Sequence, residues 1–161
     1  MLVLGIDPGL AATGYGLVEG DSQTLRPIAY GVVRTPAHLS ITERLVMLYD
    51  ELRRIIDEFA PHQAAVEELF FATNARTAMT VSQARGVALL ALAKAGLSAA
   101  EYTPLQVKQA TTGYGQAGKE QVQEMVRLLL GLKETPRPDD AADGLAVAIC
   151  HLSHSRLAGI P

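Results

Sequence analysis

Four acidic residues stand where the neighbouring sequence is apolar, which is an unfavourable place for a charge. Two belong to short apolar stretches that predict strands, and two open an apolar stretch that predicts a helix. They are Asp7, Glu67, Asp140 and Asp143. An isolated buried carboxylate costs several kcal/mol unless it is paired, protonated or bound to a cation. The folded protein must therefore compensate these four groups.

A shared metal site would compensate all four carboxylates at once. Asp140 and Asp143 are three residues apart, so a helix projects both from one face. Asp7 and Glu67 lie near the ends of strands that we expect to be neighbours. Oxygen-only ligation suits Mg²⁺ or Mn²⁺ rather than zinc. Two such ions, about 3.5–4 Å apart, can activate a water and stabilise the leaving oxygen, which predicts hydrolysis of phosphodiester bonds.

Each acid taken alone also has a structural interpretation. Asp7-Pro8-Gly9 is a common turn sequence. Asp140 and Asp143 suit the start of a helix, where the macrodipole favours acids. Glu67 is followed by Glu68, and strand alternation does not say which of the two faces solvent. The conjunction of all four acids carries the metal-site hypothesis.

The intervening sequence predicts the elements that position these acids. Short runs bounded by turn-forming residues predict strands at Leu2–Ile6, Thr13–Val18, Ile28–Arg34, Ala64–Leu69 and Ala99–Thr103. Apolar residues at steps of three and four predict helices at Ser40–Phe59, Ala75–Ala95, Lys119–Leu130 and Asp139–Leu157. Ser40 and Glu43 form a capping box at the start of the first helix. We expect an α/β fold in which helices flank a mixed sheet.

Length and composition indicate one globular domain over residues 1–161. Hydrophobic residues make up 48% of the chain and charged residues 19%, which excludes a disordered protein. The single cysteine, Cys150, cannot form an internal disulfide. The longest apolar run, Val87–Ala93, is far shorter than the roughly 20 residues that span a bilayer. With no recognisable leader, we expect a cytoplasmic protein outside the membrane.

Charge is distributed unevenly along the chain. The net charge is −3, which by itself argues against a nucleic-acid partner. Residues 72–133, however, carry seven basic and three acidic side chains, a surplus of four positive charges between acidic ends. This segment is either a nucleic-acid-binding face or the solvated surface of ordinary helices.

Motifs along nearly the whole chain resemble the RuvC family of bacterial Holliday-junction resolvases. They are Gly5-Ile6-Asp7-Pro8-Gly9, Thr13-Gly14-Tyr15-Gly16, Ala65-Val66-Glu67 followed by Phe70, Asn74, Gln83-Ala84-Arg85-Gly86, Gln106-Val107-Lys108-Gln109 and Asp140-Ala141-Ala142-Asp143. The series in this order is highly specific. The opening motif alone is weak, because sheet-based ATPases and sugar kinases share it, but those proteins need a second lobe that this chain lacks.

The resemblance implies an RNase H-like fold with a mixed five-stranded sheet and a site for two Mg²⁺ ions, with Mn²⁺ as a possible substitute. It assigns Asp7, Glu67, Asp140 and Asp143 as catalytic metal ligands, and it favours Glu67 over Glu68. Some family members carry His at the position of Asp143, so this chain has the all-carboxylate version.

The resemblance also implies residues that contact DNA. Lys108 and Lys119 match basic residues that hold the scissile strand or stabilise phosphate charge. Phe70 matches an aromatic residue at the junction crossover, where stacking on an unpaired base is worth about 1–3 kcal/mol. Phe71 would then be a core residue. The structural alternatives are a surface lysine, a first-turn lysine and two core phenylalanines.

The activity implied by the resemblance is resolution of Holliday junctions in DNA recombination and repair. A homodimer would nick two opposing strands symmetrically and act with the RuvA–RuvB branch-migration machinery. We expect the dimer interface on the predicted helix Ala75–Ala95, which has more apolar residues than one core face requires. The alternatives are a non-catalytic junction-binding scaffold, which retention of all four acids disfavours, and an RNase H-type or pre-ribosomal RNA nuclease. Substrate choice in a cleavage assay separates them.

Overall fold

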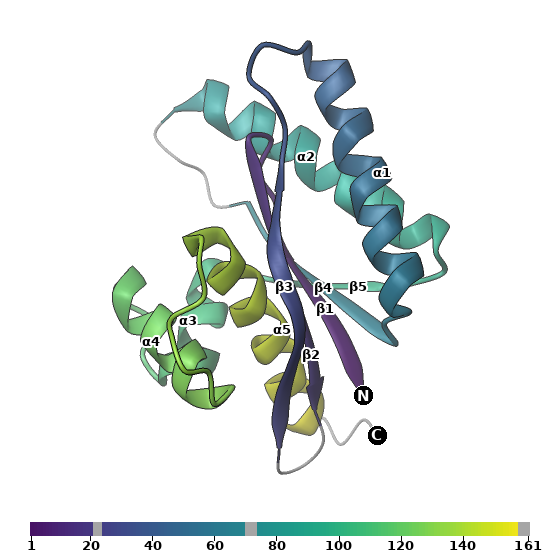
Figure 1. The fold of residues 1–161 in the computed structure, drawn as a ribbon. Coiled ribbons are helices and arrows are strands. Elements are labelled where there is room, and N and C mark those ends of the chain that lie inside the picture. The colour runs from purple at the N-terminus through teal and green to yellow at the C-terminus, as the bar shows by residue number, and fades with distance from the viewer. Residues whose placement is uncertain (21–23, 70–73, 158–161) are drawn as a thin grey trace.

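A computed structural model of the chain describes residues 1–20, 24–69 and 74–157. They form one five-stranded sheet with helices packed on it (Figure 1). Its strands are β1 (Leu2–Asp7), β2 (Ala12–Gly20), β3 (Leu25–Arg34), β4 (Gln63–Glu67) and β5 (Ala99–Tyr102). They lie in the order β3-β2-β1-β4-β5. The first three strands form an antiparallel meander, whereas β1, β4 and β5 are parallel. The expected mixed five-stranded sheet is confirmed.

Helices cover both faces of this sheet. α1 (Ile41–Phe59) and α2 (Ala75–Lys94) lie on one face, and α5 (Asp139–Leu157) lies on the other (Figure 1). α3 (Pro104–Thr112) and α4 (Lys119–Leu129) pack against α5 on its outer side. None of the helices in the described ranges is long and apolar enough to cross a membrane.

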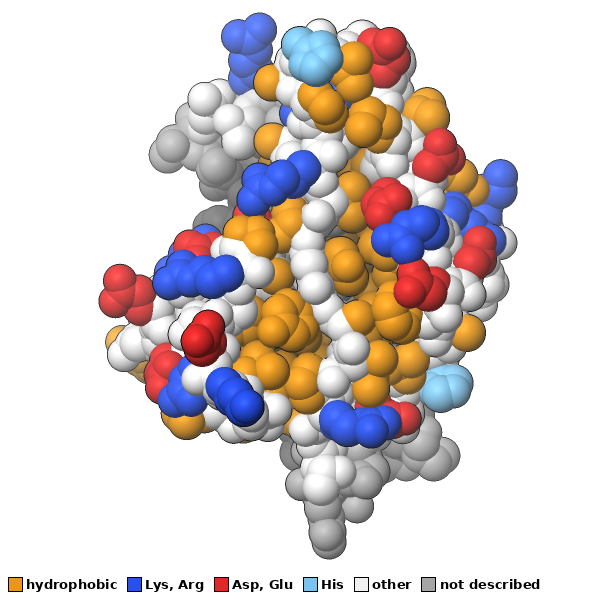
Figure 2. Space-filling model, viewed as in Figure 1, with side chains coloured by type: hydrophobic (Ala, Val, Ile, Leu, Met, Phe, Trp, Pro, Cys, Tyr) orange, Lys and Arg blue, Asp and Glu red, His pale blue; other side chains and the backbone are white. Residues whose placement is uncertain are grey.

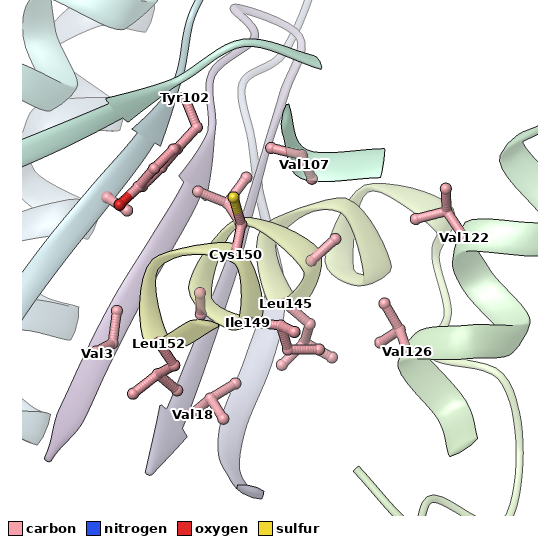
Figure 3. Packing of buried hydrophobic residues seen from close by; sticks show 14 of the residues in the cluster. Val3, Val18, Tyr102, Val107, Val122, Val126, Leu145, Ile149, Cys150 and Leu152 are labelled. Atoms are coloured by element: carbon pink, nitrogen blue, oxygen red, sulfur yellow. The ribbon is translucent and has the colours of Figure 1, made fainter. Parts of the chain in front are cut away.

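Alternation along the strands gives each face its own buried core. In β1, Leu4 and Ile6 face α1 and α2, whereas Val3 faces α5. Figure 3 shows the α5 core, in which side chains from β1, β2, α3 and α4 surround the helix. Cys150 of α5 is fully buried there, as expected for a small core residue. The same alternation places Asp7 on the α5 face.

Glycines allow α5 to lie directly on β1 and β2. A Cβ atom on Gly14 would stand 1.8 Å from the carbonyl oxygen of Asp140, and one on Gly5 would stand 2.3 Å from that of Gly144. A Cβ on Gly144 would meet the Tyr15 backbone at 2.5 Å. The helix and sheet backbones are therefore in contact. This contact brings the first turns of α5 close to the end of β1.

The observed strands begin or end within three residues of the predicted ones. The largest difference is β3, which begins at Leu25 rather than Ile28 and includes Pro27. Proline lacks the N–H that a central strand needs, but β3 is an edge strand, where proline is tolerated. Ile28 and Tyr30 are exposed on this strand.

One helix, α3, was not predicted from the sequence. Its start is well defined: Gln106 N–H donates to Thr103 Oγ1 at 3.2 Å, and Thr103 N–H donates to Gln106 Oε1 at 2.9 Å. Pro104 occupies the first helical position, where it is favoured. This capping box was a usable signal in the sequence. This helix matters for the site because it carries Lys108.

Candidate active site

The carboxyl ends of β1 and β4 place two acidic side chains together. These strands are parallel neighbours in which Ile6 pairs with Val66, so Asp7 and Glu67 end them at the same edge of the sheet. The charge of Glu67 acts on Asp7. Alternation along β4 directs Glu67 to the α5 face and Glu68 to the α2 face. The structure thus separates two glutamates that the sequence pattern left equivalent.

The first turns of α5 bring the other two predicted ligands to this edge. Asp143 lines the same hollow as Asp7 and Glu67. The charge of Asp140 acts on Asp7 and on Asp143. All four acids that the sequence singled out therefore converge at one end of the sheet.

A hollow of about 280 Å³ opens beside these acids, and we call it the lysine hollow. Its charged lining consists of Asp7, Glu67, Asp143, Lys108 and Lys119. Lys108 lies in the middle of α3, and Lys119 is the first residue of α4. Both lysines predicted to contact DNA therefore stand beside the acids. A site with this lining can bind a phosphate next to a group of carboxylates.

Burial and repulsion between neighbouring carboxylates raise the pKa values of Asp7, Glu67 and Asp143. Burial raises the pKa of Asp7 well above its usual range, and the charges of Glu67 and Asp140 raise it further. Burial likewise raises the pKa of Glu67. The pKa of Asp143 is raised to about 6, first by burial and then by the charge of Asp7, while Lys119 opposes the shift. These directions are those of carboxylates crowded together out of water.

Two acids of α5 hold Lys119 in place. Its Nζ lies 3.6 Å from Asp143 Oδ2 and 3.8 Å from Asp139 Oδ2. Asp139 also forms an ion pair with Arg137 at 2.5 Å. A lysine in the first turn of a helix opposes the macrodipole, and these acids offset that cost. Asp139 is a residue that sequence reasoning missed, although its place beside Asp140 in an acidic cluster was a signal.

The donor chemistry of the lysine hollow fits a hard divalent cation. Within the described ranges, no three His, Cys, Asp or Glu side chains are arranged to enclose a metal ion. The hollow nevertheless offers carboxylate oxygens as its anionic groups, and these groups raise one another's pKa values. A divalent cation would relieve that repulsion, and oxygen ligands suit Mg²⁺ and Mn²⁺. Asp7, Glu67, Asp140 and Asp143 are the residues that would hold it.

One predicted contact residue, Phe70, lies outside the described residues. The segment on either side is described: Leu69 follows β4, and Asn74 caps α2 by accepting a hydrogen bond from Arg76 N–H at 3.0 Å. Stacking by Phe70 at a junction crossover therefore stays a prediction from the resemblance.

The fold and the acid-lined edge together define a class of protein. A mixed sheet in this order, with carboxylates ending its central parallel strands and opening the helix on its face, is that of the metal-dependent nucleases with an RNase H-like fold. Within that class, the family model for "Crossover junction endodeoxyribonuclease RuvC" matches residues 3–151. The chain belongs to the RuvC family.

Relatives and solved structures agree with this family. The RuvC of Desulfitobacterium hafniense is 61% identical over 155 residues, which is 96% of this chain and 93% of the relative. The RuvC of Heliobacterium modesticaldum is 58% identical over 160 residues, or 99% and 98% of the two chains. The RuvC of Thermus thermophilus, solved in complex with a Holliday junction substrate, has a TM-score of 0.93 at 40% identity and covers 98% of this chain and 96% of that one. The resemblance found in the sequence is confirmed.

The stability of the metal-free protein should fall as pH rises through the titration of Asp143. Its folded-state pKa of about 6 lies above its ordinary value of 3.8, so the folded state binds this proton more tightly than the unfolded chain does. The group's contribution to the free energy of unfolding is thus fully present below about pH 4 and is lost as pH rises to about 6. Asp143→Asn should flatten this decline and raise the melting temperature near pH 7.

Thermal melting in a chelator, from about pH 4.5 to 7.5, measures this effect. Asp50→Asn on the exposed surface of α1 serves as the control and should follow the parent profile. An Asp143→Asn profile as steep as the parent's, or a melting temperature below the parent's near pH 7, contradicts the prediction.

Proposed function

We propose that this chain is a metal-dependent endonuclease that resolves four-way DNA junctions by nicking two opposing strands symmetrically. The lysine hollow carries the proposal, because it gathers acids from β1, β4 and α5 beside Lys108 and Lys119. Membership of the RuvC family and the likeness to a solved RuvC with a Holliday junction substrate support the choice of substrate.

The lysine hollow and the neighbouring Asp140 would share the tasks that hydrolysis requires. Asp7, Glu67, Asp140 and Asp143 hold the metal ions. Two Mg²⁺ ions, for which Mn²⁺ can substitute, supply an activated water and stabilise the leaving oxygen when bound. Lys108 and Lys119 bind the oxygens of the scissile phosphate and offset the charge that develops on them. The partial burial of the acids strengthens each of these electrostatic interactions.

A cleavage assay on a synthetic four-way junction tests the function. We expect paired nicks in Mg²⁺, no nicks in a chelator, and much slower cleavage of an RNA–DNA hybrid or a structured RNA. Comparable cleavage of either RNA substrate would favour an RNase H-type or RNA-processing nuclease. Binding of the junction with no nicking in Mg²⁺ or Mn²⁺ would favour a scaffold.

The basic surplus of residues 72–133 supplies the positive charge for DNA near the site. Figure 2 shows that basic and acidic side chains are interspersed on one face of the molecule, around an apolar band, so the surplus does not form a continuous basic surface there. Lys108 and Lys119 instead concentrate positive charge in the lysine hollow. We infer that local phosphate contacts by Lys108 and Lys119 anchor the cleaved strand.

Lys108→Ala should weaken the salt dependence of junction binding. If Lys108 neutralises one phosphate, the slope of log affinity against log salt becomes shallower by about 0.9. Lys94→Ala is a matched control. The start of α2 lies near Asp7 and Glu67, whereas Lys94 ends the helix about 30 Å away. Binding is measured in a chelator across a salt series. A Lys108→Ala slope equal to that of the parent and of Lys94→Ala removes Lys108 from the phosphate contacts.

We further propose that the protein acts as a homodimer through α2. Met79 and Leu90 lie three turns apart on one side of this helix and are 66% and 53% exposed, which is unusual for large apolar side chains. A two-fold dimer would match the symmetry of a four-way junction. Leu90→Arg should give a monomer in sedimentation at micromolar concentration. Leu128→Arg on α4, where the side chain is 54% exposed, should leave the dimer intact.

The cellular setting is proposed from the family. We expect the protein to act in the cytoplasm and to receive its junctions from the RuvA–RuvB branch-migration machinery. Addition of RuvA and RuvB should change the rate of junction cleavage by the parent protein, and an unchanged rate would argue against this partnership.

A further inference from the structure

The edge formed by Asp7 and Glu67 borders a second hollow. This hollow, of about 260 Å³, is lined by Glu68 and Leu69 after β4, and by Thr77 and Val81 of α2. We call it the Glu68 hollow. It lies across the acid pair from the lysine hollow, and both hollows share Asp7, Glu67 and Pro104.

We propose that the Glu68 hollow binds a nucleobase next to the scissile phosphate, and that Glu68 and Thr77 select a base that carries an exocyclic amino group. The inference rests on the proposed function and adds to it a specificity-determining site. A nucleotide strand whose scissile phosphate reaches the lysine hollow has its neighbouring base within reach of this second hollow, because the same two acids border both.

The charges of the two hollows differ in a way that orients the strand. Lys108 and Lys119 line the lysine hollow, which therefore attracts phosphate. The described lining of the Glu68 hollow has no lysine or arginine and adds the carboxylate of Glu68 to the shared acids. A phosphate is repelled there. The neutral part of the nucleotide, its base, is the part that fits.

The lining of the Glu68 hollow suits the surface of a base. Leu69, Val81 and Ala78 offer apolar contacts for a ring face. The Glu68 carboxylate can accept a hydrogen bond from an exocyclic amino group such as that of cytosine, and a Thr77 hydroxyl can serve as donor or acceptor. The volume lies just below the roughly 300–1,000 Å³ of most small-molecule sites, which suits one base.

Regular structure holds both polar residues in position. The backbone N–H of Glu68 donates to the carbonyl oxygen of Tyr102 at 2.8 Å, which continues the pairing of β4 with β5 by one residue. Thr77 lies in the first turn of α2, and its carbonyl oxygen accepts from the Thr80 hydroxyl at 3.0 Å. The backbone of both residues is thus held before DNA binds, which favours discrimination between bases.

Cleavage of junctions that differ only at the nucleotides flanking the cut tests the proposal. We expect the parent protein to cut a junction with cytosine at one flank at least about fivefold faster than one with thymine there. Glu68→Gln should reduce this ratio to about twofold or less, and Thr77→Val should reduce it in part. Glu58→Gln, a surface acid on α1, is the control for the lost charge.

A base analogue makes the test specific to the amino group. Replacing cytosine by 2-pyrimidinone, which lacks that group, should slow the parent as much as Glu68→Ala, which removes the acceptor, and should slow the Glu68→Ala variant no further. If the rate losses from the base replacement and from the Glu68 substitution are fully additive, the proposal is overturned. Equal rates on all bases by the parent, or a uniform loss on all bases in Glu68→Gln, also overturn it while the proposed function stands. Absence of nicking by the parent in Mg²⁺ overturns both.

Discussion

Asp7→Asn should abolish the nicking of a four-way junction, with a rate loss of at least about a hundredfold. Asp7 ends β1 at the sheet edge, where burial and the charge of Glu67 raise its pKa. Asparagine keeps the size of the side chain but removes the charge that would hold a divalent cation. Metal ions contribute several kcal/mol of transition-state stabilisation in such sites, and about 1.4 kcal/mol corresponds to a tenfold change in rate.

Junction affinity of Asp7→Asn should match or exceed that of the parent, because the variant removes a negative charge and keeps Lys108 and Lys119. Single-turnover cleavage in Mg²⁺ and junction binding in a chelator separate the two effects. Asp50→Asn on α1 should cut at the parental rate. If Asp7→Asn also cuts at that rate in Mg²⁺, Asp7 is not a metal ligand.

The candidate site could be predicted from the sequence because its residues conflict with their surroundings. An acid at the end of an apolar strand or the start of an apolar helix violates the hydrophobic pattern, and such violations concentrate at functional sites. Glu67 and Glu68 show the limit of this reasoning. Both violate the pattern equally, and alternation places them on opposite sides of the sheet, but only the register of β4 against β1 and β5 shows which of the two faces α5.

The fold was predictable where a local signal decides the structure. The capping box of Ser40 and Glu43 marks the start of α1, and both of its hydrogen bonds are present. The start of β3 was missed because Pro27 normally argues against a strand, and only the position of β3 at the sheet edge permits it. Edge position depends on the order of all five strands, which no local pattern encodes.

The approach of α5 to the sheet is the feature on which the site depends most. In the sequence, the glycines at this contact are only strand residues of low β-propensity. In the structure, Gly14 lies opposite Asp7 in the β1–β2 pairing and also touches the backbone of Asp140. One residue therefore links a proposed metal ligand at the end of a strand to one at the start of a helix.

Gly14→Ala should disrupt stability and cleavage together. Its Cβ would stand 1.8 Å from the Asp140 carbonyl oxygen, which is backbone and cannot rotate away, so α5 or β2 must shift. Overpacking of this kind costs about 1–3 kcal/mol, which lowers the melting temperature by about 2–12 °C in a chain of this size. Displacement of Asp140 and Asp143 by about 1 Å should reduce cleavage about a hundredfold.

Gly86→Ala is the matched control for Gly14→Ala. Gly86 lies in α2 on the side that carries Met79 and Leu90, so it is a control for packing within one chain, where no atom stands within 4 Å of the Cβ that alanine would add. Alanine there favours the helix by about 0.5–1 kcal/mol, so the melting temperature should stay level or rise slightly. Thermal melting and single-turnover cleavage of both variants measure the contrast. A Gly14→Ala protein that melts and cuts as the parent does would show that the acids of α5 reach the sheet edge without this backbone contact.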